Sequence, residues 1–524
     1  TRSASLLMSR RGAAISTPHH LATQVGSQIL GAGGNATDAT IGANAVLGVV
    51  APETCGIGGD MFALIWHDGL DHPDALNASG PAGSGSDAHM LRRANQGRMP
   101  HMGVPTITVP GCVGGWEALA ARHGSMPLTE VLTPAIALAD GGFSASPELA
   151  RSLAARHDAL AGQPAAEGLY PGGAPPRTGD RLHRPGLAVS LRAIAMGGAA
   201  AHYGGAAGVD IVDATAGNIT QADLIGFEPA WVEPIGVPLF GITGWTVPPN
   251  SQGYLTLATL AIFESTGVEP GDPAWTHLLI ESYRTAAANR DTVLSDPRFL
   301  PSQFSDMTDL AHLAALGGEI DWAQAGRFPT PARAPGGTAY LCAVDGNGMA
   351  VSFIQSNFSG IGSGVGAGKS GFFLHNRGAG FNLIEGHPNE IAPGKRPLHT
   401  LSPTLWTGGG RAVALLGTRG GHQQPQILAQ VAASTLGAGE SIENAQQAVR
   451  WTIDEFGPGT DSSLFVESRI SPVLKDDLEN RGHRVQLGRP LEPGWGPVSM
   501  IAVGDGPPAT HPDPRVSTTS VAIA

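Results

Sequence analysis

The sequence of 524 residues is poor in cysteine and in charged residues. Its three cysteines, Cys55, Cys112 and Cys342, form no C-x-x-C pair, so they indicate neither a disulfide framework nor a zinc site. Only 14% of the residues are charged, and acidic residues outnumber basic ones to give a net charge of −13. That charge would repel a phosphate backbone, so we expect a small-molecule partner and no nucleic acid.

Long apolar runs are missing as well. No apolar span reaches the 18 residues or so that suggest a membrane helix, and residues 1–11 lack the apolar core of a signal peptide. We therefore expect no membrane partner. A reducing compartment suits the sparse cysteines, which favours the cytoplasm.

Glycine, proline and apolar residues are abundant instead, with 74 glycines, 41 prolines and 42% apolar residues. The glycines and prolines follow no short period, which predicts a globular protein with many tight turns rather than a fibrous or disordered chain. One core usually stops growing below this length, so we expect several layers or two closely packed parts.

The expected elements are a mixture of helices and strands. Thr17-Pro18 predicts the start of a helix that runs to Gly31, and residues 36–50 form a second helix of small side chains. Further along, residues 338–344 and 349–355 are two β-rich runs joined by an Asp-Gly-Asn-Gly turn, which predicts a hairpin. Helical patterns then return, so the fold class is α+β.

Several common catalytic motifs are absent from the sequence. A phosphate-binding loop ending in Gly368-Lys369-Ser370 would need a glycine where Ser363 stands. No H-E-x-x-H or G-x-S-x-G pattern occurs among the residues. We therefore expect no metal, no nucleotide or other cofactor, and no α/β-hydrolase serine triad.

Thr338 follows two glycines and opens the first strand of the expected hairpin. By itself this pattern is typical of a β-branched residue after a turn. If the Gly337–Thr338 bond is cut, however, Thr338 gains a free α-amine beside its hydroxyl, and an α-amine with a pKa of about 7.7–8.0 is a suitable base near neutral pH. The backbone N–H groups of Gly420 and Gly421 could then receive an oxyanion, although an ordinary turn explains this pair equally well.

Six blocks of the sequence resemble, in the same order, those of γ-glutamyltransferase-like proteins of the N-terminal-nucleophile hydrolase superfamily. They are PHHLATQVGSQILGAGGNATDATIGANAVLGVVAPETCGIGGDMF, TVPGCVGGWEAL, VPPNSQGYLTL, ESYRTAAANRDTVLSDP, PGKRPLHTLSPT and HPDPR. The resemblance implies a four-layer αββα sandwich and self-cleavage before Thr338. It also implies a large fragment, residues 1–337, intertwined with a small fragment, residues 338–524, as a heterodimer. Whether two such heterodimers pair stays open.

The same resemblance implies roles for individual residues. Thr338 would be the nucleophile, and Gly420 and Gly421 the oxyanion donors. The acyl pocket would be lined by Gln355, Asn357, Asn376 and Thr400. Strand-surface amides and loop caps are the structural alternatives for these four.

Departures from the family pattern affect the substrate more than the chemistry. Glutamyl-transferring members bind the donor's α-carboxylate with an arginine, where this sequence offers only Asn77 and Pro81. They bind its α-ammonium with an acidic residue, where this sequence has Gly380, three residues after Arg377. Further replacements are Ala339 and Tyr340, after the nucleophile, and His399, in the pocket loop.

Arg377 is always charged and would favour a carboxylate on the acyl group over an ammonium. We therefore hypothesise an amidohydrolase or acylase for acid-bearing acyl amides, in a branch that resembles oxamate amidohydrolases and cephalosporin acylase-like proteins. Alternatively, Arg377 pairs with an acid such as Glu385 and is structural. Two other functions also remain open, a true glutathione hydrolase and transpeptidase, and an unprocessed binding protein.

Overall fold

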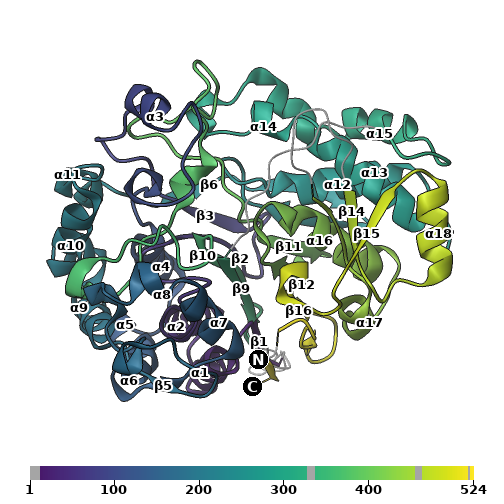
Figure 1. Ribbon diagram of the computed structural model, residues 1–524. Helices are drawn as coiled ribbons and strands as arrows, with labels where there is room; N and C mark the ends of the chain where they lie inside the picture. The colour runs from purple at the N-terminus through teal and green to yellow at the C-terminus, as the bar shows by residue number, and fades with distance from the viewer. Residues whose placement is uncertain (1–11, 327–336, 455–462, 517–519, 524) are drawn as a thin grey trace, which may run out of the picture.

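The computed structural model describes residues 12–326, 337–454, 463–516 and 520–523. Residues 1–11, on which the expectation of no signal peptide rests, lie outside these ranges. The described chain forms two stacked β-sheets, each covered on its outer side by helices (Figure 1). The predicted αββα sandwich is confirmed.

The first sheet has seven strands in the order β18-β1-β9-β10-β2-β3-β6, and every neighbouring pair is antiparallel. Its strands are β1 (Ala14–Thr17), β2 (Asp60–Trp66), β3 (Asp74–Ala78), β6 (Ala230–Val232), β9 (Gly337–Val344), β10 (Ala350–Phe358) and β18 (Ser520–Ile523). Strands from before and after residue 338 are therefore interleaved in one sheet, since β1 lies between β18 and β9 and β2 lies next to β10. The two predicted fragments share this sheet, whereas the cut between them stays a prediction.

The second sheet has six strands in the order β17-β16-β12-β11-β8-β7 and is also antiparallel. Its strands are β7 (Ile235–Leu239), β8 (Ile242–Thr246), β11 (Thr404–Gly408), β12 (Arg411–Thr418), β16 (Val498–Ala502) and β17 (Ala509–Thr510). Smaller sheets join β4 (Phe143–Ser144) to β5 (Arg181–Leu182), and β13 (Trp451–Asp454) to β14 (Ser463–Glu467) and β15 (Arg484–Gly488).

Two helical layers cover the sheets, one formed early in the chain and one later (Figure 1). The first includes α1 (His20–Gly31), α2 (Ala36–Val50), α4 (Cys112–His123), α6 (Thr133–Gly141) and α9 (Pro185–Tyr203). The second includes α12 (Tyr254–Ser265), α13 (Trp275–Ala287), α15 (Leu310–Gly318) and α16 (Gln424–Ala432). The other helices are α3 (Ala88–Ala94), α5 (Leu128–Val131), α7 (Pro147–Ala155), α8 (His157–Leu160), α10 (Ala206–Thr215), α11 (Gln221–Ile225), α14 (Arg290–Val293), α17 (Ile442–Gln447) and α18 (Pro472–Asn480).

Strand β9 does not alternate between polar and apolar residues, because it is buried on both faces. Ala339, Leu341 and Ala343 pack into the core under the first helical layer, whereas Tyr340 and Cys342 pack between the sheets. Because successive side chains of a strand point to opposite faces, a strand buried on both sides must be apolar throughout. The alternation also places the Thr338 side chain on the face that is directed at the second sheet.

Most of the predicted elements are found, but the start of the first helix is wrong. Thr17 is the last residue of β1, and α1 begins three residues later, at His20. The cap is His19, whose Nδ1 accepts a hydrogen bond from the N–H of Leu21 at 3.2 Å. Thr17 has a typical capping side chain, but β1 pairs with β9 and β18, and this pairing keeps Thr17 extended.

All three cysteines are buried and free, as their spacing predicts. None of the helices in the described ranges combines the length and the apolar character that a bilayer crossing requires.

Candidate active site

Thr338 lies at the start of β9 and is almost completely buried. Its hydroxyl is 3.0 Å from the Ser356 hydroxyl on the neighbouring strand β10. The Ser356 hydroxyl donates to the carbonyl oxygen of Gly337 at 2.6 Å and accepts from the N–H of Phe358 at 2.7 Å. Because Ser356 has only one proton to donate, Thr338 is the donor in the 3.0 Å contact. Ser356 thus connects the Thr338 hydroxyl to the carbonyl group of the preceding residue.

Gly420 and Gly421 follow the end of β12, in the sheet that faces Thr338. Their φ angles are +129° and +58°, which only glycine adopts without strain. Arg419, the residue before them, lines the same cavity as Gly337. The glycine turn and the start of β9 therefore lie at one place in the molecule.

Gln252 connects this turn to the loop that contains Thr400. Its side-chain amide donates to the carbonyl oxygens of Gly421 at 3.1 Å and of Thr400 at 3.2 Å. The Arg290 guanidinium donates to the other end of the same amide at 3.1 Å and to His422 Nδ1 at 2.8 Å. Burial and the nearby Arg290 hold the pKa of His422 well below its usual range, so His422 stays neutral and accepts this bond.

Arg377 is buried with only 1% of its surface exposed. Its Nη1 donates to the Thr400 hydroxyl at 3.0 Å, and its guanidinium carbon lies 3.6 Å from the centre of the Phe358 ring. Within the described residues, its Nε and Nη2 have no hydrogen-bond partner. The pKa of Arg377 is lowered to about 9, mainly by burial; Asp60 opposes the shift and Arg290 adds to it. At neutral pH Arg377 is therefore a buried cation with two unused donors.

Gly380 provides the space for this guanidinium. A Cβ at position 380 would lie 2.6 Å from Arg377 Nη2 and 2.6 Å from the carbonyl oxygen of Leu398. A side chain at this position would therefore displace Arg377. The glycine at 380, where glutamyl-transferring members have an acidic residue, and the guanidinium of Arg377 therefore depend on each other. Glu385, the structural partner considered from the sequence, is exposed, and the observed partner of Arg377 is Thr400.

Asp60, at the start of β2, is a buried carboxylate near Arg377. Its oxygens accept hydrogen bonds from the N–H of Gly80 at 3.1 Å and from Nε2 of His399 at 3.2 Å. His399 Nδ1 accepts from the N–H of Leu401, so Nε2 carries the proton of the neutral ring. Burial pushes the pKa of Asp60 upward, but His375 and the bond from His399 outweigh it and lower the pKa. Asp60 thus balances part of the charge of Arg377.

The predicted pocket residues are not all brought to one place. Gln355 lies on the opposite face of β10 from Ser356, where its side chain bonds both the N–H and the carbonyl oxygen of Gly56. Asn376 holds a loop by accepting from the N–H of Ser359 and donating to the carbonyl oxygen of His101. These contacts match the structural alternatives, and the substrate-binding roles of Gln355 and Asn376 stay predictions.

Asn357 and Thr400 have groups that remain available. The Asn357 amide donates to the carbonyl oxygen of Pro52 at 3.1 Å, whereas its buried Oδ1 has no partner within the described residues. Thr400 accepts from Arg377. The substrate-binding roles of Asn357 and Thr400 also stay predictions.

Several residues that shape the site were not predicted from the sequence. They are Ser356, Phe358, Asp60, Gln252 and Arg290. Asp60 and Gln252 stand inside GIGGD and VPPNSQG, which belong to blocks that indicate the family. The sequence of these blocks does not show which residues Asp60 and Gln252 contact. Only the fold brings Gln252 to Thr400, 148 residues later in the chain.

The other replacements in the sequence have structural partners. Asn77 donates to the Asn250 side chain at 3.0 Å, in the buried interior. The Tyr340 hydroxyl lies 2.9 Å from that of Ser352, and its ring packs against Gly417 between the sheets. Asn77 and Tyr340 thus contribute to the core around the site.

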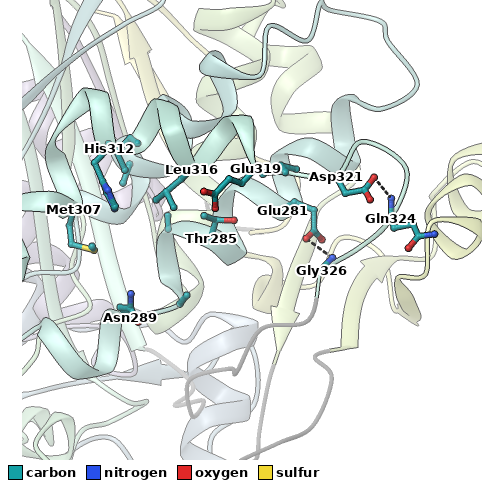
Figure 2. A pocket seen from close by; sticks show the side chains of 15 residues that line it. Glu281, Thr285, Asn289, Met307, His312, Leu316, Glu319, Asp321, Gln324 and Gly326 are labelled. Carbon is teal, nitrogen blue, oxygen red and sulfur yellow. Dashed lines mark hydrogen bonds between the residues drawn. The ribbon is translucent and has the colours of Figure 1, made fainter.

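A separate cavity of about 410 Å³ lies between α13 and α15, and Figure 2 shows the side chains that line it. None of the predicted catalytic or pocket residues lines it. The nearby cluster of His277, Glu281 and His483 has the residue types of a metal site. However, His277 Nδ1 and His483 Nε2 are hydrogen-bonded to each other at 2.8 Å, and Glu281 bonds Arg284. Because these groups bond one another and Arg284, we assign no metal to them.

Comparison with known proteins identifies this arrangement. The family model described as gamma-glutamyltranspeptidase matches residues 22–523. The chain is 34% identical to the glutathione hydrolase-like YwrD proenzyme of Bacillus subtilis, over 97% of this chain and 98% of that protein. It is 33% identical to the oxamate amidohydrolase proenzyme of Klebsiella pneumoniae, over 92% of each.

The fold is equally similar to a solved structure. The crystal structure of cephalosporin acylase from Bacillus halodurans superposes with a TM-score of 0.90 at 32% identity. The match covers 100% of this chain and 97% of that chain. Both the sequence and the fold are therefore similar to known proteins along the whole chain.

Proposed function

This chain belongs to the γ-glutamyltranspeptidase family of N-terminal-nucleophile hydrolases, and we propose that it hydrolyses amides whose acyl group bears a second carboxylate. It is an enzyme made as a proenzyme, like its relatives. Thr338 is the proposed nucleophile, and Arg377 is the proposed carboxylate-binding residue. The proposal goes beyond family membership in these residue roles and in the substrate class.

Self-cleavage is the first proposed reaction. The Thr338 hydroxyl attacks the Gly337 carbonyl carbon, the C–N bond between the two residues breaks, and the Thr338 nitrogen takes up a proton. Water then hydrolyses the resulting ester. The Ser356 hydroxyl, bonded to both the Thr338 hydroxyl and the Gly337 oxygen, supports this step because it holds the two reacting groups together. The products, 1–337 and 338–524, stay together as a heterodimer because they share the first sheet; pairing of two heterodimers stays open.

Amide hydrolysis then uses the new α-amine. This amine takes the proton of the Thr338 hydroxyl as the oxygen attacks the substrate carbonyl, and it returns the proton to the leaving nitrogen. The N–H groups of Gly420 and Gly421 receive the negative charge on the carbonyl oxygen. Water enters in the second half and releases the acid.

The observation that supports an acid-bearing acyl group is the state of Arg377. Its buried guanidinium has two donors without partners. Arg290 lies close enough to lower the pKa of Arg377, and Arg377 lies close enough to lower that of His101. A carboxylate would satisfy both donors through two parallel hydrogen bonds. A γ-glutamyl group brings an α-ammonium beside its α-carboxylate, and position 380, a glycine, offers no acidic partner for that ammonium. We therefore expect glutathione to be a poor substrate.

A substrate panel tests the proposal. Processed protein is assayed with oxamate, glutaramic acid, the uncharged butyramide and glutathione, with ammonia or cysteinylglycine release as the readout. We expect one of the two acid-bearing amides to exceed butyramide and glutathione by at least about tenfold in kcat/KM, the effect of one charge-assisted hydrogen bond. Equal rates for acid-bearing and uncharged amides, or a clear preference for glutathione, would contradict the proposed substrate class.

A further inference from the structure

Apart from Arg377, a cavity of about 350 Å³ has Gly337, the residue before Thr338, in its wall. Its other lining residues include Glu53, Glu148, Arg151, Gly360 and Arg419. None of these residues contacts Arg377 or Thr400 by a hydrogen bond among those described. Neither Arg377 nor Thr400 lines this cavity.

Two acids in this cavity have oxygens without partners. Glu53 is 9% exposed, and its buried Oε2 has no hydrogen-bond partner within the described residues. Glu148, in the first turn of α7, bonds Arg419 with one oxygen at 2.9 Å, whereas its other oxygen is buried and unpartnered. A buried oxygen without a donor costs free energy, so both oxygens favour a ligand that brings N–H groups.

The position of the cavity determines which part of a substrate it meets. The α-amine of processed Thr338 lies where the bond to Gly337 was, at the cavity wall. This amine must reach the leaving nitrogen to protonate it, so the leaving group has to lie on the same side. Under the proposed function, the acyl group instead lies with Arg377, which does not line this cavity.

We propose that this cavity is the subsite for the leaving amine and that it prefers amines carrying a second ammonium group. Glu53 and Glu148 accept the hydrogen bonds of this group through their unpartnered oxygens. The subsite rests on the proposed amide hydrolysis and adds the chemical class of the amine to it. The reaction is unchanged: the C–N bond breaks, and the leaving nitrogen takes the proton that the α-amine holds.

The charges around Glu53 fit this preference. Burial and the neighbouring Glu148 raise the pKa of Glu53 to about 8, while Arg419 and Arg184 oppose the shift. Arg419 is already bonded to Glu148, and Arg184 donates to the carbonyl oxygens of Gly48 and Gly371. A bound ammonium would give Glu53 the cationic partner that these arginines do not supply.

Matched amides test the subsite. The N-(3-aminopropyl) and N-butyl amides of oxalic and glutaric monoacids have the same length and differ in one terminal group. Processed wild-type protein should favour the aminopropyl amide by about tenfold in kcat/KM. In Glu53→Gln and Glu148→Gln the ratio should fall towards one, whereas the matched control Glu319→Gln, at the cavity of Figure 2, should keep the wild-type ratio.

A binding measurement on the wild-type protein tests the subsite without turnover and without any variant. Ligand-observed NMR compares 1,3-diaminopropane with butylamine on processed wild-type protein, and we expect only the diamine to bind. Equal kcat/KM for the two amides, or equal binding of the two amines, would overturn the subsite while leaving amide hydrolysis intact. Absence of turnover on every amide would instead contradict the proposed function, and the NMR result would still decide the subsite.

Discussion

Two buried charged groups of the candidate site differ in sign: Arg377 is a cation with two unused donors, and Glu53 is an acid with an unused oxygen. The cation contacts Phe358 and Thr400, and the acid lines a cavity with Gly337. The family chemistry requires only the nucleophile and the oxyanion donors, which are common to both sides. Under the two proposals above, this chain would select its substrates by opposite charges at the two ends of the amide.

Removal of Arg377 should have the largest effect on this selection. In Arg377→Ala a carboxylate loses two charge-assisted hydrogen bonds, together worth about 3 kcal/mol, so kcat/KM for acid-bearing amides should fall about 100-fold. Most of the loss should appear as a higher KM. Arg377→Lys is the conservative control. It should recover only part of the lost kcat/KM, because the lysine ammonium lacks the planar pair of donors that a guanidinium presents to a carboxylate. If KM for acid-bearing amides stays at the wild-type value in both variants, Arg377 does not bind the carboxylate.

A side chain at position 380 should have a similar but smaller effect. The new Cβ of Gly380→Ala meets Arg377 Nη2 at 2.6 Å, so the guanidinium must move, and we expect KM for acid-bearing amides to rise about tenfold. Gly162→Ala is a matched control because nothing lies within 4 Å of its added Cβ. Steady-state kinetics on processed protein measures both variants. An unchanged KM in Gly380→Ala would mean that the position of this guanidinium does not matter.

Substitution of Gln252 should change the rate of catalysis rather than the preference for the acyl group or the leaving amine. Gln252→Met removes the bonds to Thr400 and Gly421 but keeps the length of the side chain, so the oxyanion glycines lose a support. We expect kcat to fall about fivefold with a nearly constant KM. Gln430→Met is the control, since Gln430 bonds Trp451 in the outer layer. A change confined to KM would place Gln252 in substrate binding instead.

The smallest predicted effect is a pH dependence on the Glu53 side. Because the pKa of Glu53 is raised to about 8, its negative charge is mostly absent at pH 7 and mostly present at pH 9. The preference for the aminopropyl over the butyl amide should therefore increase about threefold between these pH values. The ratio cancels the titration of the Thr338 α-amine, which affects both amides equally. A flat ratio in the wild type, or the same increase in Glu53→Gln, would exclude Glu53 as the titrating group.

The sequence predicts those parts of the molecule that depend on neighbouring residues or on family blocks. The hairpin around Thr338 follows from its turn residues, and the glycine turn at 420–421 follows from its composition. The αββα layers follow from the resemblance. These features need no knowledge of contacts between distant residues.

The remaining parts depend on tertiary contacts. Thr17 has the residue type of a helix cap, yet the pairing of β1 with its neighbours makes it part of a strand. Ser356 becomes a partner of Thr338 only through the register between β9 and β10. The space that Gly380 leaves for Arg377 depends on the path of the loop past Leu398. Sequence patterns do not supply these contacts, and they left Ser356 unidentified.

The most direct test of self-cleavage at Thr338 is intact mass spectrometry of the purified wild-type protein beside Thr338→Ala. The wild type should give two fragments whose masses correspond to a cut between Gly337 and Thr338, whereas Thr338→Ala should give one uncut chain without amidase activity. A cut at the same bond in Thr338→Ala, or amide turnover by an uncut wild-type chain, would contradict Thr338 as the nucleophile.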